Sequence, residues 1–250
     1  MPLGNPAPDN PLPPTRHDAA YGRRAALGKA LLGIGMFRAG AARAQVQAPT
    51  PRPVRLMALG DSLTAGYGLP PGQGFVPQLQ AALAARPGAH RPVRVLDAGV
   101  SGDTTAGGLA RLDWALAEAP DCVLVELGGN DGLRGLPTDR MAQALESILS
   151  RLERRGVPTL LAGMHAPPNL GADYGRAFHA VFTEAAARRP DVIFMPFFLE
   201  GVAGERALNQ PDGIHPNAQG VAEMIRQILP SVAALLALVP PLPGAPRTGG

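Results

Sequence analysis

Short apolar runs alternate along the chain with stretches in which apolar residues recur at helical spacing. The runs predict strands at residues 54–59, 93–96, 121–127, 157–162 and 191–195. The helical spacing falls at residues 75–83, 109–116, 141–152, 178–182 and 221–229. This alternation is typical of parallel strands joined by helical crossovers. The sequence therefore predicts an α/β fold, a three-layer sandwich with a five-stranded, mostly parallel sheet covered by helices on both faces.

The first 44 residues read as a leader outside this pattern. Arg23 and Arg24 precede a mildly apolar stretch, residues 25–37, and a small-x-small cleavage pattern ends at Ala44. This order predicts a twin-arginine-like signal peptide over residues 1–44 and a periplasmic or secreted protein. The alternative interpretation is an amphipathic helix of the folded domain.

The rest of the chain divides into three parts by composition. Residues 45–53 hold three prolines and read as a linker. Residues 54–238 carry the strand and helix pattern and are expected to form one domain, a size that suits a single core. Residues 239–250 are rich in proline and glycine and are expected to be a flexible tail.

Charge and cysteine content exclude several classes of protein. The net charge of +3 comes from the leader, because outside it 17 basic and 18 acidic side chains remain. We therefore expect no nucleic-acid partner. No apolar stretch of 18 residues or more is present, so we expect no integral membrane span. Cys122 is the single cysteine, which excludes an intramolecular disulfide and a multi-cysteine metal site.

Polar residues gather in four loops of the predicted fold. They are Gly60-Asp61-Ser62-Leu63 after the first strand, residues 98–104 after the second, Gly128-Gly129-Asn130-Asp131 after the third and residues 212–217 before the last helix. In a parallel sheet the first three loops share one edge, where ligands bind.

These four blocks resemble those of the SGNH (GDSL) hydrolases, a family named for Ser, Gly, Asn and His in four such blocks. All four are present here in the family's order, and the fuller strings are most similar to its branch of periplasmic thioesterases, lysophospholipases and arylesterases. The resemblance spans nearly all of the chain after the leader, up to the tail. It implies a flavodoxin-like sheet and hydrolysis of carboxylic esters or thioesters.

The residues themselves support a serine nucleophile. Ser62 lies just after a strand, and its hydroxyl needs a neighbouring base to take its proton. His215 is the candidate base, and Asp212, three residues earlier, can accept the proton of its Nδ1 and hold the ring in place. The alternatives are that Ser62 only caps a helix and that Asp212 caps the turn on which His215 packs.

An acyl-transfer site also needs donors for the oxyanion. Gly102 can offer a backbone N–H and Asn130 a side-chain N–H. The resemblance implies that these two and the backbone N–H of Ser62 form the oxyanion hole. The alternatives are a plain turn glycine at position 102 and a helix cap at position 130.

Several other polar residues are expected to support the loops. Asp61 and Asp131 should accept local backbone N–H groups, and Asp103 should begin a helix in the same way. Glu126 lies within a strand pattern, and nothing in the sequence indicates a partner for it. Cys122 is expected to be a small buried residue.

The sequence thus predicts a serine esterase that forms an acyl-enzyme on Ser62, with a small acyl ester or thioester as substrate. No cofactor and no metal are needed for this chemistry. Residues 164–174 and 196–204 either shape an acyl pocket or complete the core. The alternatives are a carbohydrate or acetyl-ester deacetylase of the same superfamily and a non-catalytic ligand-binding module on this scaffold.

Overall fold

The structure, a computed structural model, describes residues 52–86 and 91–240. The expected signal peptide, residues 1–44, lies outside the described residues. So do most of the expected linker and all but the first two residues of the expected tail. One of those two, Val239, is buried, and its carbonyl accepts a hydrogen bond from Arg91.

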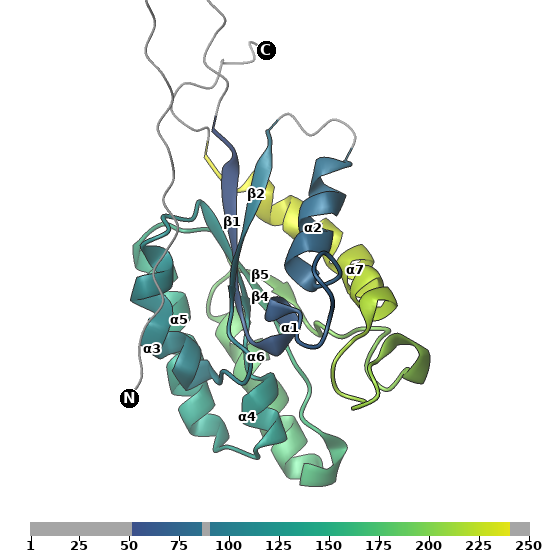
Figure 1. The fold of residues 1–250 in the computed structure, drawn as a ribbon. Helices are drawn as coiled ribbons and strands as arrows, with labels where there is room; N and C mark the ends of the chain where they lie inside the picture. Colours follow the sequence, from purple (N-terminus) through teal and green to yellow (C-terminus); the bar gives the residue numbers. More distant parts are fainter. Residues whose placement is uncertain (1–51, 87–90, 241–250) are drawn as a thin grey trace, which may run out of the picture. The chain divides into compact units, whose positions relative to one another are not determined.

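A single five-stranded sheet forms the middle layer (Figure 1). Its strands are β1 (Val54–Gly60), β2 (Val93–Gly99), β3 (Cys122–Glu126), β4 (Thr159–Ala162) and β5 (Ile193–Met195). They lie in the order β2-β1-β3-β4-β5, and every neighbouring pair is parallel. This is the flavodoxin-like order of a doubly wound sheet, so the predicted fold class is confirmed.

Helices cover both faces of the sheet. They are α1 (Ser62–Ala65), α2 (Phe75–Ala84), α3 (Thr105–Leu116), α4 (Gly129–Leu133), α5 (Thr138–Arg154), α6 (Ala172–Ala187) and α7 (Ala218–Ala237), with two 3-10 turns, η1 (Pro168–Leu170) and η2 (Arg206–Leu208). Helices α1, α2 and α7 pack on one face, whereas α3 and α5 cover the other, with α6 against α5 (Figure 1). The five predicted helices are all present.

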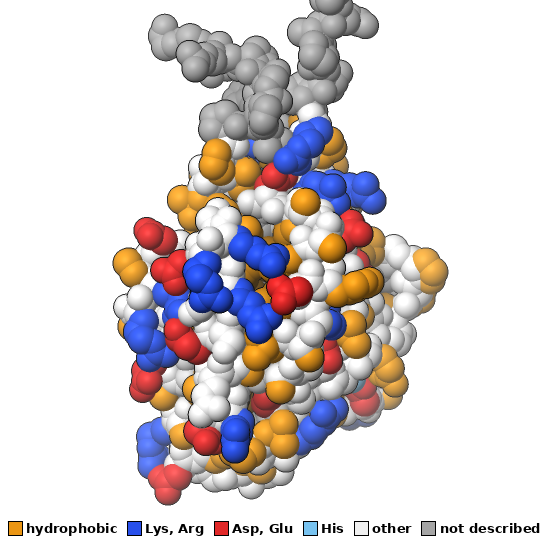
Figure 2. Space-filling model, turned by 90° about the vertical axis from the view of Figure 1, so that its left-hand side faces the viewer, with side chains coloured by type: hydrophobic (Ala, Val, Ile, Leu, Met, Phe, Trp, Pro, Cys, Tyr) orange, Lys and Arg blue, Asp and Glu red, His pale blue; other side chains and the backbone are white. Residues whose placement is uncertain are grey.

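The face formed by α3 and α5 mixes charges of both signs (Figure 2). Arg151 and Arg155 of α5 both pair with Asp113 of α3, at 3.0 and 2.9 Å. Basic and acidic side chains are interspersed on this face.

Strand β3 is buried along its whole length, as expected of a central parallel strand covered on both faces. Strand β2 at the sheet edge runs three residues further than predicted, because residues 97–99 continue the pairing with β1 although Asp97 is exposed. At the edge of a sheet, a polar residue such as Asp97 can break the apolar sequence pattern while the backbone pairing with the next strand continues.

Helix α7 follows the last strand and is the last element of the described chain. In the described part of the chain it is the helix that is long and apolar enough to cross a membrane. Here it packs against β4, β5 and α2, and its buried side chains, such as Met224 and Ile228, belong to the core. It therefore serves as a core helix of the sandwich in this structure.

The carboxyl ends of three strands meet at one edge of the sheet. Gly60, the last residue of β1, stands opposite both Gly99 of β2 and Glu126 of β3. The loops that leave these strands therefore start side by side, as the sequence predicted, and they carry Ser62, Gly102 and Asn130.

Candidate active site

Ser62 begins the short helix α1, immediately after β1. Its side chain lies at the surface of a cavity and the residue is 9 % exposed. Asp61 caps the turn, because its Oδ1 accepts a hydrogen bond from the Leu63 N–H at 3.0 Å. The expected role of Asp61 in holding its loop is confirmed, and the same turn presents the Ser62 hydroxyl to the cavity.

His215 and Asp212 belong to one tight loop between η2 and α7. Asp212 Oδ1 accepts the backbone N–H of Ile214 at 2.9 Å and that of His215 at 3.0 Å. Its other oxygen, Oδ2, lies 2.6 Å from His215 Nδ1. The loop is closed by an antiparallel bridge between Asn209 and Pro216. The imidazole is thus held by the loop on which it sits.

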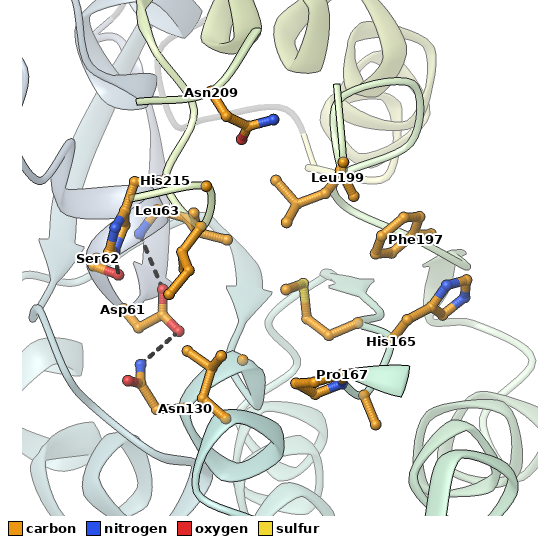
Figure 3. Close-up of a pocket in the computed structure, with 18 of the residues that line it drawn as sticks. Asp61, Ser62, Leu63, Asn130, His165, Pro167, Phe197, Leu199, Asn209 and His215 are labelled. Carbon is orange, nitrogen blue, oxygen red and sulfur yellow. Dashed lines mark hydrogen bonds between the residues drawn. The ribbon is translucent and has the colours of Figure 1, made fainter. Parts of the chain in front are cut away.

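The three residues come together across 150 residues of sequence. Ser62 Oγ lies 2.9 Å from His215 Nε2 (Figure 3). Burial raises the pKa of Asp212, but hydrogen bonds from the backbone and ring of His215 and from Ile214 outweigh it and lower that pKa to about 2. An ionised carboxylate only accepts, so Nδ1 carries the proton and Nε2 is left to accept the Ser62 hydroxyl proton.

Asn130 lies in the first turn of α4, on the same side of the cavity as Ser62 (Figure 3). Its Nδ2 donates a hydrogen bond to Asp61 Oδ2 at 3.0 Å. An amide carries two N–H donors, so one is committed to Asp61 and the second is available to a ligand. The sequence placed Asn130 beside Ser62 but did not indicate that Asp61 holds it.

Gly102 lies in the turn after β2 with φ +85°, a conformation that favours glycine. Its carbonyl accepts a hydrogen bond from Arg134 Nη2 at 2.8 Å. It is not among the residues that line the cavity around Ser62, and no hydrogen bond joins it to Ser62 or Asn130 in the described structure. Its expected place in an oxyanion hole stays a prediction.

The cavity in front of Ser62 has a volume of about 480 Å³. Its walls are mostly apolar and come from α4, from the loops after β4 and β5, and from the His215 loop; they include Leu133, Met164, Pro167, Phe197, Leu199 and Ile214. Segments 164–174 and 196–204 both contribute, as the pocket interpretation predicted. Some of their residues complete the core instead, since Phe198 is fully buried.

An aromatic pair forms the side of the cavity opposite Ser62 (Figure 3). The rings of His165 and Phe197 stack with centroids 4.0 Å apart and an angle of 6°. Burial lowers the pKa of His165, and the nearby His179 lowers it further. A stacked aromatic pair, whose histidine favours the neutral form, therefore lies across the cavity from the serine.

Two acidic residues around the site have partners that the sequence did not indicate. Asp131 accepts the backbone N–H and the hydroxyl of Thr105 at 2.9 and 2.8 Å, which joins α4 to the start of α3. The prediction for Asp103 was wrong, because Thr104 caps α3 and Asp103 pairs with Arg111 at 2.6 Å. The carboxylate pairs with this arginine, eight residues further along the chain, instead of capping the helix.

Burial accounts for the chemical behaviour expected of Cys122. Cys122 is fully buried, and burial raises the pKa of its thiol to about 12, so it is an inert core residue as expected. Within residues 52–86 and 91–240, no group of three or more His, Cys, Asp or Glu side chains is arranged to hold a metal ion.

Comparison with known proteins decides the family. Residues 58–223 match the model of the GDSL-like Lipase/Acylhydrolase family. The chain belongs to this family. It is therefore an ester-bond hydrolase, in agreement with the sequence blocks and with the contacts around Ser62.

Members of the family with similar sequences are named for ester and thioester hydrolysis. Esterase TesA of Pseudomonas aeruginosa is 42% identical over 72% of this chain and 89% of its own. An arylesterase of Vibrio mimicus is 37% identical over 70% and 88%. Thioesterase 1/protease 1/lysophospholipase L1 of Escherichia coli is 38% identical over 71% and 84%.

Solved structures of the GDSL-like family share the fold. The crystal structure of TesA superposes with a TM-score of 0.68 at 42% identity, over 72% of this chain and 99% of that one. A Pseudoalteromonas esterase, EstA, in a structure inhibited by monoethylphosphonate, gives a TM-score of 0.68 at 33% identity, over 73% and 98%. The esterase AlinE4 gives 0.61 at 44% identity, over 74% and 98%.

Two further residues touch the proton-transfer pair of this GDSL-like site. The ring of Tyr67 lies 4.7 Å from that of His215, centroid to centroid. Gln210 Nε2 donates to the carbonyls of Tyr67 and Pro216 at 2.8 and 2.9 Å, and so ties the Ser62 turn to the His215 loop. The sequence analysis missed both. Tyr67 follows the Gly60–Leu63 block by four residues, whereas nothing in the sequence distinguishes Gln210.

Proposed function

We propose that Ser62 is the nucleophile, His215 the general base and Asp212 the residue that orients it, in hydrolysis of carboxylic esters or thioesters. One observation carries this proposal: Ser62 Oγ lies 2.9 Å from Nε2 of an imidazole whose Nδ1 is held by Asp212. Two hydrogen bonds in series give the serine a base and give the base an anionic partner.

The reaction follows from these contacts. His215 Nε2 takes the Ser62 proton as Oγ attacks the carbonyl carbon, and the adjacent Asp212 carboxylate stabilises the imidazolium. The imidazolium then gives its proton to the departing alcohol or thiol, which leaves an acyl group on Ser62. Water, deprotonated by the same ring, attacks the acyl-enzyme and releases the acid.

We assign the oxyanion to three donors: the backbone N–H groups of Ser62 and Gly102 and the side chain of Asn130. Support for Asn130 comes from its second amide proton, since the first is committed to Asp61. Support for Gly102 comes from its position after β2, at the strand ends that carry Ser62 and Asn130. Loss of one such donor slows comparable enzymes by about 10²–10³-fold.

The substrate is a small apolar acyl ester, aryl ester or acyl thioester. The cavity of about 480 Å³ offers apolar walls to an acyl or aryl group, and the His165–Phe197 stack offers it a flat surface. Relatives named as an esterase, an arylesterase and a thioesterase support the same substrate class. A carbohydrate deacetylase would need hydrogen-bonding groups for sugar hydroxyls along these walls.

Replacement of the serine tests the mechanism directly. Ser62→Ala should abolish hydrolysis of p-nitrophenyl butyrate and covalent labelling by a fluorophosphonate, because both need the Oγ nucleophile. The label on the wild-type protein should map to the peptide that contains Ser62. Ser101→Ala, at an exposed serine in the neighbouring loop, is the matched control and should keep both.

Persistence of ester hydrolysis in Ser62→Ala, with the melting temperature unchanged, would refute the assignment. A folded wild-type protein that neither labels nor hydrolyses any ester of a chain-length panel would instead favour the non-catalytic ligand-binding module.

We further propose that residues 1–44 direct the protein to the periplasm or beyond as a twin-arginine-like signal. The paired Arg23 and Arg24 and the pattern ending at Ala44 support this, and the family match begins after them, at residue 58. Protein recovered from the periplasm of a bacterial host should begin at Gln45 by mass spectrometry. Replacement of both arginines by lysine should leave it in the cytoplasm, and export of that variant would refute the route.

A further inference from the structure

Glu126 ends β3 directly beneath the turn that presents Ser62. It is a fully buried acidic residue, 0 % exposed, in a strand that is otherwise apolar. Its Oε2 accepts a hydrogen bond from the Thr64 hydroxyl at 2.8 Å and another from the Asp61 N–H at 3.3 Å. These donors flank Ser62 on both sides, so one carboxyl oxygen holds both ends of the turn.

The contact continues from Asp61 to Asn130. The Asp61 carboxylate, 1 % exposed, accepts the Leu63 N–H and the Asn130 amide, each at 3.0 Å. Glu126, Asp61 and Asn130 therefore form a chain of hydrogen bonds that links β3, the Ser62 turn and α4. Glu126 precedes Asn130 by only four residues, yet the hydrogen bonds connect the two through Asp61 in the loop after β1.

The β1 strand is shaped to admit this contact. A Cβ atom at Gly60 would lie 2.0 Å from Thr64 Oγ1 and 2.6 Å from Glu126 Oε2, so glycine leaves the room that the carboxyl group needs. Gly60 is also the β1 residue opposite Glu126 in the sheet register. The close approach is therefore built into the backbone.

The second oxygen, Oε1, is buried without a hydrogen-bond partner among the described residues. If Glu126 were ionised, its buried negative charge would receive hydrogen bonds at only one of its two oxygens, which is energetically costly. The charged groups nearby are Asp61, which repels a second negative charge, and Arg111 of α3, which donates to the Gly60 carbonyl at 2.8 Å. In the sheet register, the β4 residue opposite Glu126 is Ala162.

The two buried acids, Glu126 and Asp61, differ in how far hydrogen bonds offset the effect of burial on their pKa values. Burial raises the pKa of Glu126 well above its usual range, and the negative charge of Asp61 raises it further. Burial raises the pKa of Asp61 to about 6, with the Leu63 and Asn130 donors opposing the rise. Burial thus favours the protonated form of both acids, and it does so more strongly at Glu126, whose second oxygen receives no hydrogen bond from the described residues.

We propose that Glu126 is a positioning residue that acts as a neutral carboxylic acid, fixing the Ser62 turn and, through Asp61, the amide of Asn130. This inference rests on the proposed function of Ser62 and Asn130. Glu126 touches no substrate. It affects the reaction indirectly, because it fixes the orientation of the Ser62 hydroxyl and the position of the Asn130 amide relative to the oxyanion.

Two variants at position 126 test the proposal. Glu126→Leu removes both accepted hydrogen bonds and should lower kcat by about 10²-fold with KM little changed, because small misplacements of reacting groups slow catalysis strongly. Glu126→Gln keeps a neutral carbonyl acceptor and should recover most of that loss. kcat should be expressed per serine titrated with a fluorophosphonate, so that unfolded protein does not count.

A second pair applies if Glu126→Leu does not fold. Thr64→Val removes one hydrogen bond to Glu126 and should lower kcat by up to about tenfold, whereas Thr64→Ser keeps the hydroxyl and serves as its control. Melting temperatures measured beside the rates separate a loss of folding from a loss of positioning.

Two results would overturn the inference. Glu126→Gln as slow as Glu126→Leu, with a wild-type melting temperature and an altered pH profile between pH 6 and 8, would mean that an ionised carboxylate is required. Wild-type kcat in Glu126→Leu or in Thr64→Val would mean that no positioning occurs. Failure of the proposed function itself looks different, because Ser62→Ala would then remain active.

Discussion

At the scale of single residues, the site depends on how each polar group is compensated. Asp212 is exposed enough to meet water, yet it accepts three hydrogen bonds from its own loop, two from backbone N–H groups and one from the His215 ring. Those bonds lower its pKa to about 2 against the effect of burial, so it stays anionic wherever the enzyme is folded. A fixed anion at this point decides which nitrogen of His215 faces the serine.

Replacement of Asp212 by asparagine should therefore lower kcat by roughly 10³–10⁴-fold, because an amide can hold the ring in the wrong tautomer. KM should change little, since the carboxylate does not line the cavity. Steady-state kinetics with a p-nitrophenyl ester measure both. An Asp212→Asn enzyme within tenfold of the wild type would show that the carboxylate is not part of the proton relay.

The two neighbouring phenylalanines of the loop after β5 should respond differently to truncation. Phe197→Ala removes the surface that stacks on His165, and kcat/KM for aryl or medium-chain esters should fall by about 10–100-fold relative to that for an acetyl ester. Phe198→Ala opens a hole in the core and should destabilise the fold by about 3–5 kcal/mol with little change in that ratio.

A chain-length panel together with urea unfolding separates the two effects. Equal loss of activity on all esters in Phe197→Ala would remove the stack from the substrate site.

At the scale of elements, the site is a contact between two loops that different parts of the fold hold in place. The loop that carries His215 is anchored at its end by Asn217, which caps α7 by accepting the N–H groups of Gln219 and Gly220, both at 3.0 Å. The same side chain donates to the carbonyls of Ala207 and Asn209 at 2.8 and 3.3 Å. One residue thus starts the last helix and fastens the loop before it.

Variants at position 217 should separate these two roles. Asn217→Ala loses the cap and the loop contacts and should destabilise the protein by about 1–2 kcal/mol, which lowers Tm by roughly 2–8 °C. Asn217→Asp keeps the capping acceptor and loses the donors to the loop, so it should recover most of the stability, whereas kcat should be reduced in both variants because the His215 loop is less firmly held. Thermal melts and rates measure the pair. Equal melting temperatures in the two variants would mean that the cap contributes nothing.

At the scale of the whole molecule, the buried acids make stability depend on pH in an unusual direction. The folded pKa of Asp61 is about 6, above its ordinary value of 3.8, so between these two values the folded protein keeps a proton that the unfolded chain has released. Stability from this group is therefore present below pH 4 and is lost as the pH rises through 6. Glu126 acts in the same direction.

Asp61→Asn removes this dependence. As the pH rises from 4 to 7, the free energy of unfolding of the wild type should fall relative to that of the variant, by an amount on the order of 3 kcal/mol. Urea unfolding at unit steps of pH measures the difference, with the exposed Asp139→Asn as control. Parallel curves for wild type and Asp61→Asn would contradict the raised pKa.

The sequence predicted the layers, the parallel sheet and the loops that carry Ser62, Asn130 and His215, because apolar periodicity and loop chemistry are local properties. It did not predict that Asn130 binds Asp61 or that Glu126 lies under the Ser62 turn. Those contacts depend on the register that places Gly60 opposite Glu126, and register is a property of the assembled sheet. The error at Asp103 has the same origin, since Arg111 reaches it only once α3 has formed.

The loop between Asn209 and Pro216 carries both Asp212 and His215, the acid and the base of the proposed relay, and its own hydrogen bonds hold them together. A rigid shift of that loop would leave the imidazole–carboxylate pair intact and would alter its contacts with the Ser62 turn, namely the hydrogen bond to the serine oxygen and the one from Gln210 to Tyr67. The proposed relay thus consists of two separately held parts, so the loop could be exchanged between relatives as one unit.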